Sequence, residues 1–178
     1  KLMRLFIYVL LFLNPLIQNY VDSTGLESID IEGTKYYFGD YNEVFLIQND
    51  SLIRADKSID SRVTINAYIF EVNDTVIKYG GYGYWSQRNF MFYFDTDSFE
   101  WEYYRLNFKD NLEGSFYGTV NSLKNDVIFY GGKKVNPQNP VEQIPSKEVV
   151  KFDYNQRKLL KLGLLKFDVL DKKLLTIS

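Results

Sequence analysis

The chain contains no cysteine and no histidine, and only four of its 178 residues are proline. The absence of cysteine excludes disulfides and thiolate chemistry within this segment, and it fits a reducing compartment or a bacterial envelope protein. The absence of histidine removes the commonest metal ligand and general base. We therefore expect these residues to bind no metal ion and no cofactor.

The sequence also lacks an excess of charge of one sign. It has 21 Lys and Arg residues against 23 Asp and Glu residues, which gives a net charge of -2 at pH 7. A protein that binds nucleic acid through its phosphates needs a basic surface. Nucleic acid is therefore not an expected partner.

Aromatic residues are abundant. Hydrophobic residues make up 46% of the chain and aromatic residues 17%, with 15 Tyr and 14 Phe. These residue types suit half-buried, pleated strands better than helices, and the chain is long enough for one domain or part of a larger one. The composition alone favours an all-β fold.

The amino terminus resembles an export signal. Lys1 and Arg4 flank Met3, and residues 5–13 form an unbroken apolar run that ends at Asn14. This pattern predicts a signal peptide over residues 1–19 and an exported protein, which would be periplasmic, on the cell surface or secreted. The run is too short to span a bilayer, so no transmembrane span is expected in this segment. A buried hydrophobic strand is the alternative.

A repeat is the most informative feature of the sequence. DTVIKYGG at residues 74–81 recurs as NDVIFYGG at residues 125–132, and Gly80 recurs as Gly131, 51 residues later. Further on, Phe94 recurs as Phe152, 58 residues later. The extra seven residues fall in a segment with three prolines, residues 133–146, which we predict to be a loop because insertions in repeated units map to loops.

Each copy is predicted to contain four short strands separated by turn formers. In the first copy they cover about residues 63–70, 75–81, 89–95 and 99–106, and in the second about residues 115–123, 126–131, 147–153 and 158–163. Asp95 and Asp97 are interpreted as hairpin-turn residues, because the glycine and glutamate that a calcium-binding loop needs at its sixth and twelfth positions are not there.

These motifs give the chain a resemblance to kelch-repeat proteins, within the superfamily of the galactose oxidase central domain. The marks of that family are a glycine pair closing the second strand, an aromatic residue followed by Asp on the third, and Trp on the fourth. The first copy has Gly80, Gly81, Asp95 and Trp101 at these positions, and the second has Gly131, Gly132 and Asp153, with Leu159 in place of Trp. The resemblance implies a kelch-type β-propeller and a structural role for these residues.

The predicted organisation follows from the repeat. It comprises a signal peptide (1–19), a partial or degenerate first blade (20–62), two kelch-like blades (63–113 and 114–164) and the start of a further blade (165–178). Because a propeller ring needs about four to eight blades, these copies predict an incomplete ring and a chain that is a fragment of a larger protein.

Two segments between predicted strands are candidate binding loops, because rigid aromatic and Arg side chains dominate binding sites. Alternatively, the aromatic residues cover the end of the propeller or pack on the next blade. The candidate residues are Tyr82, Tyr84, Trp85, Gln87 and Arg88 in residues 82–88, and Lys133, Lys134, Asn136 and Asn139 in residues 133–146.

The favoured function is a non-catalytic module that presents these loops to a protein or glycan partner. A kelch-type carbohydrate-active enzyme similar to an epimerase is an alternative, with Arg88 or residues of missing blades in its active site. A sensor domain of an envelope signalling protein is a third hypothesis.

Overall fold

The computed structural model describes residues 26–39, 41, 43–49, 51–58, 64–83, 86–123 and 126–168. These residues form strands and turns, and no helix is found among them. This confirms the prediction of an all-β fold. The chain divides into two compact units, residues 1–56 and 57–178. The predicted signal peptide (1–19) and most of the predicted further blade (169–178) lie outside the described residues.

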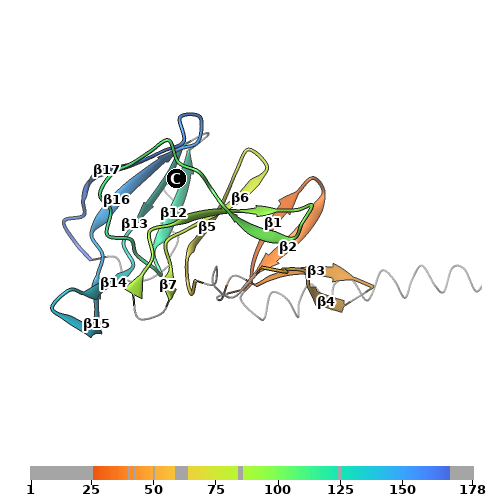
Figure 1. The fold of residues 1–178 in the computed structure, drawn as a ribbon, viewed down its shortest axis with the longest axis horizontal. Helices are drawn as coiled ribbons and strands as arrows, with labels where there is room; N and C mark the ends of the chain where they lie inside the picture. Colours follow the sequence, from red (N-terminus) through yellow and green to blue (C-terminus); the bar gives the residue numbers. More distant parts are fainter. Residues whose placement is uncertain are drawn as a thin grey trace, which may run out of the picture. The chain divides into compact units, whose positions relative to one another are not determined.

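The first unit contains one antiparallel sheet of four strands in chain order (Figure 1). The strands are β1 (Glu27–Ile31), β2 (Thr34–Phe38), β3 (Val44–Gln48) and β4 (Ser51–Arg54). Glu32 and Gly33 join β1 to β2 with positive φ angles of 50° and 79°, the geometry of a tight hairpin turn. The prediction for this region is a partial or degenerate blade over residues 20–62, and its described residues form these four strands.

The second unit begins with a four-stranded antiparallel sheet, which we call the first repeat sheet. Its strands are β5 (Tyr68–Val72), β6 (Thr75–Tyr79), β9 (Met91–Asp95) and β10 (Glu100–Tyr103), in the order β10-β9-β6-β5. Asn73 and Asp74 make the β5–β6 turn, and both have a positive φ. Asn and Asp tolerate this conformation better than most residues, which explains their place between two apolar strands.

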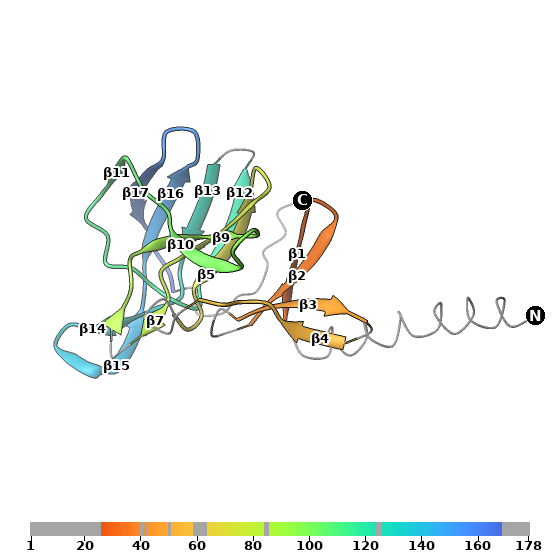
Figure 2. The same ribbon diagram turned by 45° about the vertical axis from the view of Figure 1, so that its right-hand side comes forward.

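The second repeat sheet has the same antiparallel order with one short strand added. It consists of β12 (Thr119–Leu123), β13 (Asp126–Tyr130), β16 (Glu148–Asp153) and β17 (Lys158–Leu164), with β11 (Phe108–Lys109) pairing parallel to β17 (Figure 2). Strand bounds agree with the sequence prediction to within a few residues. The added strand β11 was not predicted.

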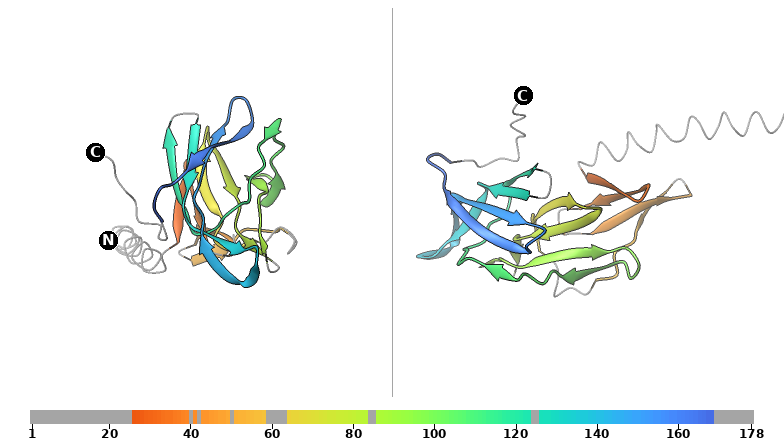
Figure 3. Two further views of the ribbon diagram at one scale, coloured as in Figure 1. Left: turned by 90° about the vertical axis from the view of Figure 1, so that its left-hand side faces the viewer. Right: turned by 90° about the horizontal axis from the view of Figure 1, so that it is seen from above.

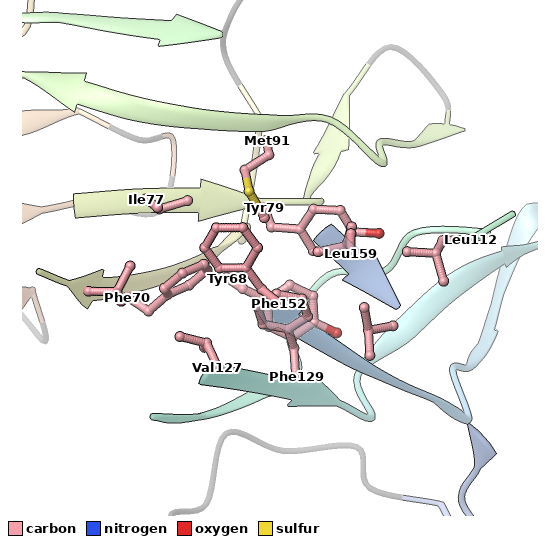
Figure 4. Packing of buried hydrophobic residues seen from close by; sticks show 12 residues of the cluster. Tyr68, Phe70, Ile77, Tyr79, Met91, Leu112, Val127, Phe129, Phe152 and Leu159 are labelled. Carbon is pink, nitrogen blue, oxygen red and sulfur yellow. The ribbon is translucent and has the colours of Figure 1, made fainter. Parts of the chain in front are cut away.

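The core of the second unit lies between the two repeat sheets. Because side chains alternate along a strand, each sheet has two faces. We call the face of the first repeat sheet that contacts the second sheet the front face. It supplies Tyr68, Phe70, Val72, Ile77, Tyr79 and Met91. It packs against the opposite, or back, face of the second repeat sheet, which supplies Val127, Phe129, Val150, Phe152 and Leu159. The rings of Tyr68, Phe129 and Phe152 lie close together at this contact (Figure 4).

Backbone conformation repeats along with the sequence. Asn66 and Tyr117, which lie 51 residues apart, both have a positive φ, as do Phe99 and Arg157, which lie 58 residues apart. A non-glycine residue with a positive φ is uncommon. Its recurrence at the two offsets of the sequence repeat shows that the two sheets share backbone geometry as well as strand order.

Two buried tyrosines at the centre of this core differ in their hydrogen bonding. Tyr68 Oη lies 2.5 Å from Ser115 Oγ and 3.2 Å from the carbonyl oxygen of Gly131, so it links the two repeat sheets. Tyr79 Oη is also buried, but among the described residues it has no hydrogen-bond partner. Burial raises the pKa of both phenols above the usual 10.

We expect substitution of these two tyrosines by Phe to have opposite effects. Tyr68→Phe should lower the free energy of unfolding by about 1 to 2 kcal/mol, because the Gly131 carbonyl oxygen and the buried Ser115 hydroxyl both lose a hydrogen-bond partner. Tyr79→Phe should leave it unchanged or raise it by up to about 1 kcal/mol, because a buried hydroxyl without a partner is removed. Urea denaturation at pH 7 measures both, and the reverse order would contradict the described hydrogen bonds.

The same two groups make stability depend on alkaline pH. The unfolded chain releases these protons near pH 10, whereas the folded chain retains them because its phenol pKa values are raised. The part of the free energy of unfolding that depends on these protonated phenols is therefore fully present below pH 10 and is lost as the pH rises above 10. In Tyr79→Phe the loss of stability above pH 10 should be smaller than in the parent protein.

Candidate functional site

The glycine pairs determine where both candidate segments leave the sheets. Gly80 and Gly81 follow β6, Gly131 and Gly132 follow β13, and all four have positive φ values between 71° and 88°. At Gly132 a Cβ atom would lie 2.3 Å from the carbonyl oxygen of Phe116. Glycine is needed here because the backbone is left-handed and another backbone segment is in close contact.

Each glycine pair is followed by a hairpin with the same hydrogen-bonded base. The first hairpin is β7 (Tyr82–Gly83) with β8 (Ser86–Gln87), and Arg88 N donates to Gly81 O over 2.7 Å. The second is β14 (Lys133–Asn136) with β15 (Asn139–Pro145), and Ser146 N donates to Gly132 O over 2.9 Å. The second hairpin projects from its sheet (Figure 3).

The prediction of a loop over residues 133–146 was wrong, because the structure has a hairpin there. Asn136 Oδ1 accepts a hydrogen bond from Gln138 N over 3.0 Å and so closes the turn. The prolines suggested a loop, but proline is tolerated in a strand whose neighbour lies on one side only. Such a hairpin presents its side chains from a more rigid backbone than a loop would.

The two hairpins contact each other at the same end of the second unit, near β7 and β14 in Figure 2. Val135 N donates to Gln87 Oε1 over 3.1 Å. This hydrogen bond joins residues from different repeats. Gln87, one of the predicted binding residues, therefore positions the neighbouring hairpin.

Several other predicted binding residues are engaged inside the unit. The Tyr82 ring lies 5.3 Å from the Phe116 ring, and Lys133 Nζ lies 5.7 Å from the centroid of the Tyr117 ring. Lys134 forms an ion pair with the carboxylate of Glu113. These contacts engage all three side chains within the unit, and for Tyr82 they match the packing alternative considered for the aromatic residues.

The exposed part of the site is the far end of the second hairpin. Asn136 Nδ2 donates to Glu142 Oε2 over 2.6 Å across the hairpin, whereas Asn139 is exposed. Val141 is 93% exposed, although it is apolar. The sequence pattern does not mark Val141, because its place at the tip depends on the hairpin register. Arg88 follows the first hairpin, and Tyr84 and Trp85 lie outside the described residues.

A buried carboxylate fixes the second repeat sheet next to this end. Glu148 is 6% exposed, and its side chain accepts hydrogen bonds from Lys161 Nζ over 2.5 Å and from Glu113 N over 3.2 Å. The hydrogen bond from Lys161 to Glu148 raises the pKa of that lysine. Nothing in the sequence pattern marks Glu148, because the equivalent position of the first repeat is Phe90.

The predicted structural residues lie in equivalent turns and strands of the two sheets. Asp95 accepts hydrogen bonds from Asp97 N and Ser98 Oγ, and Asp153 accepts one from Gln156 N. Both turns are therefore closed by the carboxylate that ends the third strand.

The equivalent residues of the fourth strand are Trp101 and Leu159, and both are fully buried. Trp101 pairs with Phe94, and Leu159 pairs with Phe152.

A pocket lined by residues of both repeat sheets was not foreseen from the sequence. It has a volume of about 310 Å³ and is lined by Tyr93, Tyr104, Tyr154 and Arg157, among others. Tyr104 and Tyr154 are 50 positions apart and meet because the two sheets pack face to face.

The described part of the chain holds no group of three or more Asp or Glu side chains arranged to bind a metal ion. It forms no helix of the length and apolarity needed to cross a bilayer.

Comparison with known proteins supports the fold. No protein-family model matches the sequence, and no curated protein is similar to it at the level of sequence. Among solved structures, the chain is similar to YjhT with a TM-score of 0.59 and 15% sequence identity. The match covers 79% of this chain and 52% of YjhT, so the chain spans about half the length of that protein.

Proposed function

We propose that the chain contributes consecutive blades of a kelch-type β-propeller and acts as a non-catalytic binding module. In this proposal each four-stranded sheet is one blade, and the hairpins next to the glycine pairs hold a protein or glycan partner. A place in the cell envelope is part of the proposal and rests on the sequence of residues 1–19.

The equivalence of sheet faces supports the proposal of blades. The offsets of the repeat place Lys78, Phe92 and Trp101 at the positions of Phe129, Val150 and Leu159, and all six are buried. The front face of the second repeat sheet carries Asn121, Ile128, Tyr130 and Val149, which are half-buried. The second repeat sheet covers the front face of the first. A further blade would cover the front face of the second repeat sheet in the same way.

The observation that carries the binding function is the shared base of the two hairpins. Both start at a glycine pair, both close on the carbonyl of its second glycine, and Gln87 joins them through Val135. At the tip, the exposed apolar Val141 lies two residues from the exposed amide of Asn139. A rigid support with a mixed apolar and polar tip suits recognition of a protein or glycan surface.

A binding screen with two matched variants tests this proposal. The parent protein, Val141→Asp and Phe108→Asp are each applied to glycan and peptide arrays. Both substitutions place a carboxylate at an exposed apolar position, but Phe108 lies on β11, away from the hairpins. We expect Val141→Asp to lose the captured ligand and Phe108→Asp to retain it. Equal binding by all three proteins would remove the hairpin tip from the site.

A further inference from the structure

We propose that the pocket lined by residues of both repeat sheets is a second binding site, which takes an acidic sugar of the hexuronate class. The pocket has a volume of about 310 Å³ and includes Thr75, the first residue of β6. The lining residues come from both repeat sheets, and none of them belongs to the two hairpins. The inference does not depend on the function proposed for the hairpins.

Three tyrosine rings of the pocket, those of Tyr93, Tyr104 and Tyr154, pack against the core behind them. The Tyr104 ring lies 6.4 Å from the Tyr93 ring at an angle of 80° and 6.4 Å from the Tyr154 ring. Its ring centroid also lies 5.5 Å from that of Phe152, which is fully buried. Rings that are already fixed lose little conformational entropy when a ligand binds, so they form a preorganised wall.

The charged side chains that line the pocket are both arginines. Arg105 follows β10, and Arg157 lies in the turn between β16 and β17, with its guanidinium carbon 5.6 Å from the centroid of the Tyr104 ring. Both side chains belong to exposed residues. Since no carboxylate lines the pocket, these guanidinium groups favour an anion, and a carboxylate matches their planar fork of donors.

The remaining lining groups select the rest of the ligand. Tyrosine presents an apolar ring face together with a hydroxyl, and Thr75 adds another hydroxyl. A six-membered ring with several hydroxyl groups uses both kinds of surface, whereas a purely aromatic acid leaves the hydroxyls without partners. The volume is at the low end for small-molecule sites, which suits one sugar ring. A hexuronate combines that ring with the carboxylate that the arginines favour.

Burial raises the pKa of Tyr104 above the usual 10, with a smaller opposing contribution from Arg157. The phenol therefore remains protonated and able to donate a hydrogen bond to a sugar oxygen, in physiological and in mildly alkaline solution.

NMR titration of the full chain tests the proposal with three probes. Glucuronate carries both the hydroxylated ring and the carboxylate, glucose lacks the carboxylate, and benzoate lacks the hydroxyls. We expect glucuronate to shift the backbone amides of residues 104–105 and 154–157, with little effect from glucose or benzoate. Shifts with benzoate alone, equal shifts with glucose, or no shifts with any probe would each overturn the assignment to an acidic sugar.

Two charge-matched variants connect the effect to the pocket. Arg157→Gln should weaken glucuronate binding by about tenfold or more, because a charge-assisted hydrogen-bond donor is lost. Arg54→Gln, which removes an exposed arginine of the first unit, should bind as the parent protein does. Equal weakening in both variants would show a general charge effect and would contradict the proposed site. Arg157→Gln should still capture the ligand that Val141→Asp loses. This result would show that the pocket and the hairpins are separate sites.

Discussion

Gly132→Ala is expected to destabilise the second unit by about 2 to 5 kcal/mol. Two costs add together at this position, where φ is 74°. A left-handed backbone costs a non-glycine residue about 1 to 2 kcal/mol, and an atom forced into a packed interior costs about 1 to 3 kcal/mol more. The added Cβ would lie 2.3 Å from Phe116 O and 2.7 Å from Gly118 N, so the backbone before β12 would have to move.

Gly33→Ala is the matched control for this effect. Gly33 has a φ of 79°, but no atom lies within 4 Å of the position that a Cβ would take. It should therefore show only the cost of the left-handed backbone, about 1 to 2 kcal/mol. Urea denaturation, followed by amide hydrogen exchange in the sheet that contains each site, measures both losses. Equal losses would mean that the close approach at Gly132 does not exist in solution.

Phe129→Ala is expected to lower the free energy of unfolding of the second unit by about 3 to 5 kcal/mol. Phe129 is 1% exposed, and its ring lies 5.5, 5.4 and 5.1 Å from the rings of Tyr68, Phe70 and Tyr79. All three partners are on the other repeat sheet. The substitution therefore leaves a cavity at the contact between the sheets.

Phe108→Ala controls for the loss of a phenylalanine as such. Phe108 is 48% exposed, and its removal should cost about 0.5 kcal/mol. Thermal or urea unfolding compares the two variants directly. If Phe129→Ala were as stable as Phe108→Ala, the packing of the two repeat sheets described here would be wrong.

The repeat explains why so much of the strand order could be predicted from the sequence. A conserved offset between two glycine pairs requires two segments with the same positive φ angles, and the structure has these at Gly80 and Gly131. The same reasoning located Leu159 at the position of Trp101, and both are buried on the fourth strand. Local sequence is sufficient where one residue type alone fits the backbone.

The first unit shows where this reasoning was weaker. Its β-strands lack a glycine pair, since Gly39 stands alone after β2, and the sequence therefore suggested only a partial copy. The alternation of apolar residues nevertheless produced four strands. The two-residue strand β11 is too short to have a periodic pattern and could be found only in three dimensions.

The candidate sites were less accessible to prediction than the fold. Gln87 was chosen as a ligand contact, but its partner Val135 lies 48 positions away, and no local pattern signals that hydrogen bond. The Tyr and Arg pocket combines residues from both sheets for the same reason. Such sites depend on packing between elements, which a single sequence does not encode in any short motif.

The two equivalent sheets of residues 57–178 pack front face on back face. Aromatic side-chain NOEs in the full chain test this packing most directly, because the rings of Tyr79 and Phe129 lie 5.1 Å apart across the contact. We predict NOEs from Phe129 to Tyr79, Tyr68 and Phe70. NOEs from Phe129 only to its own strands and their neighbours in residues 119–164 would contradict the account.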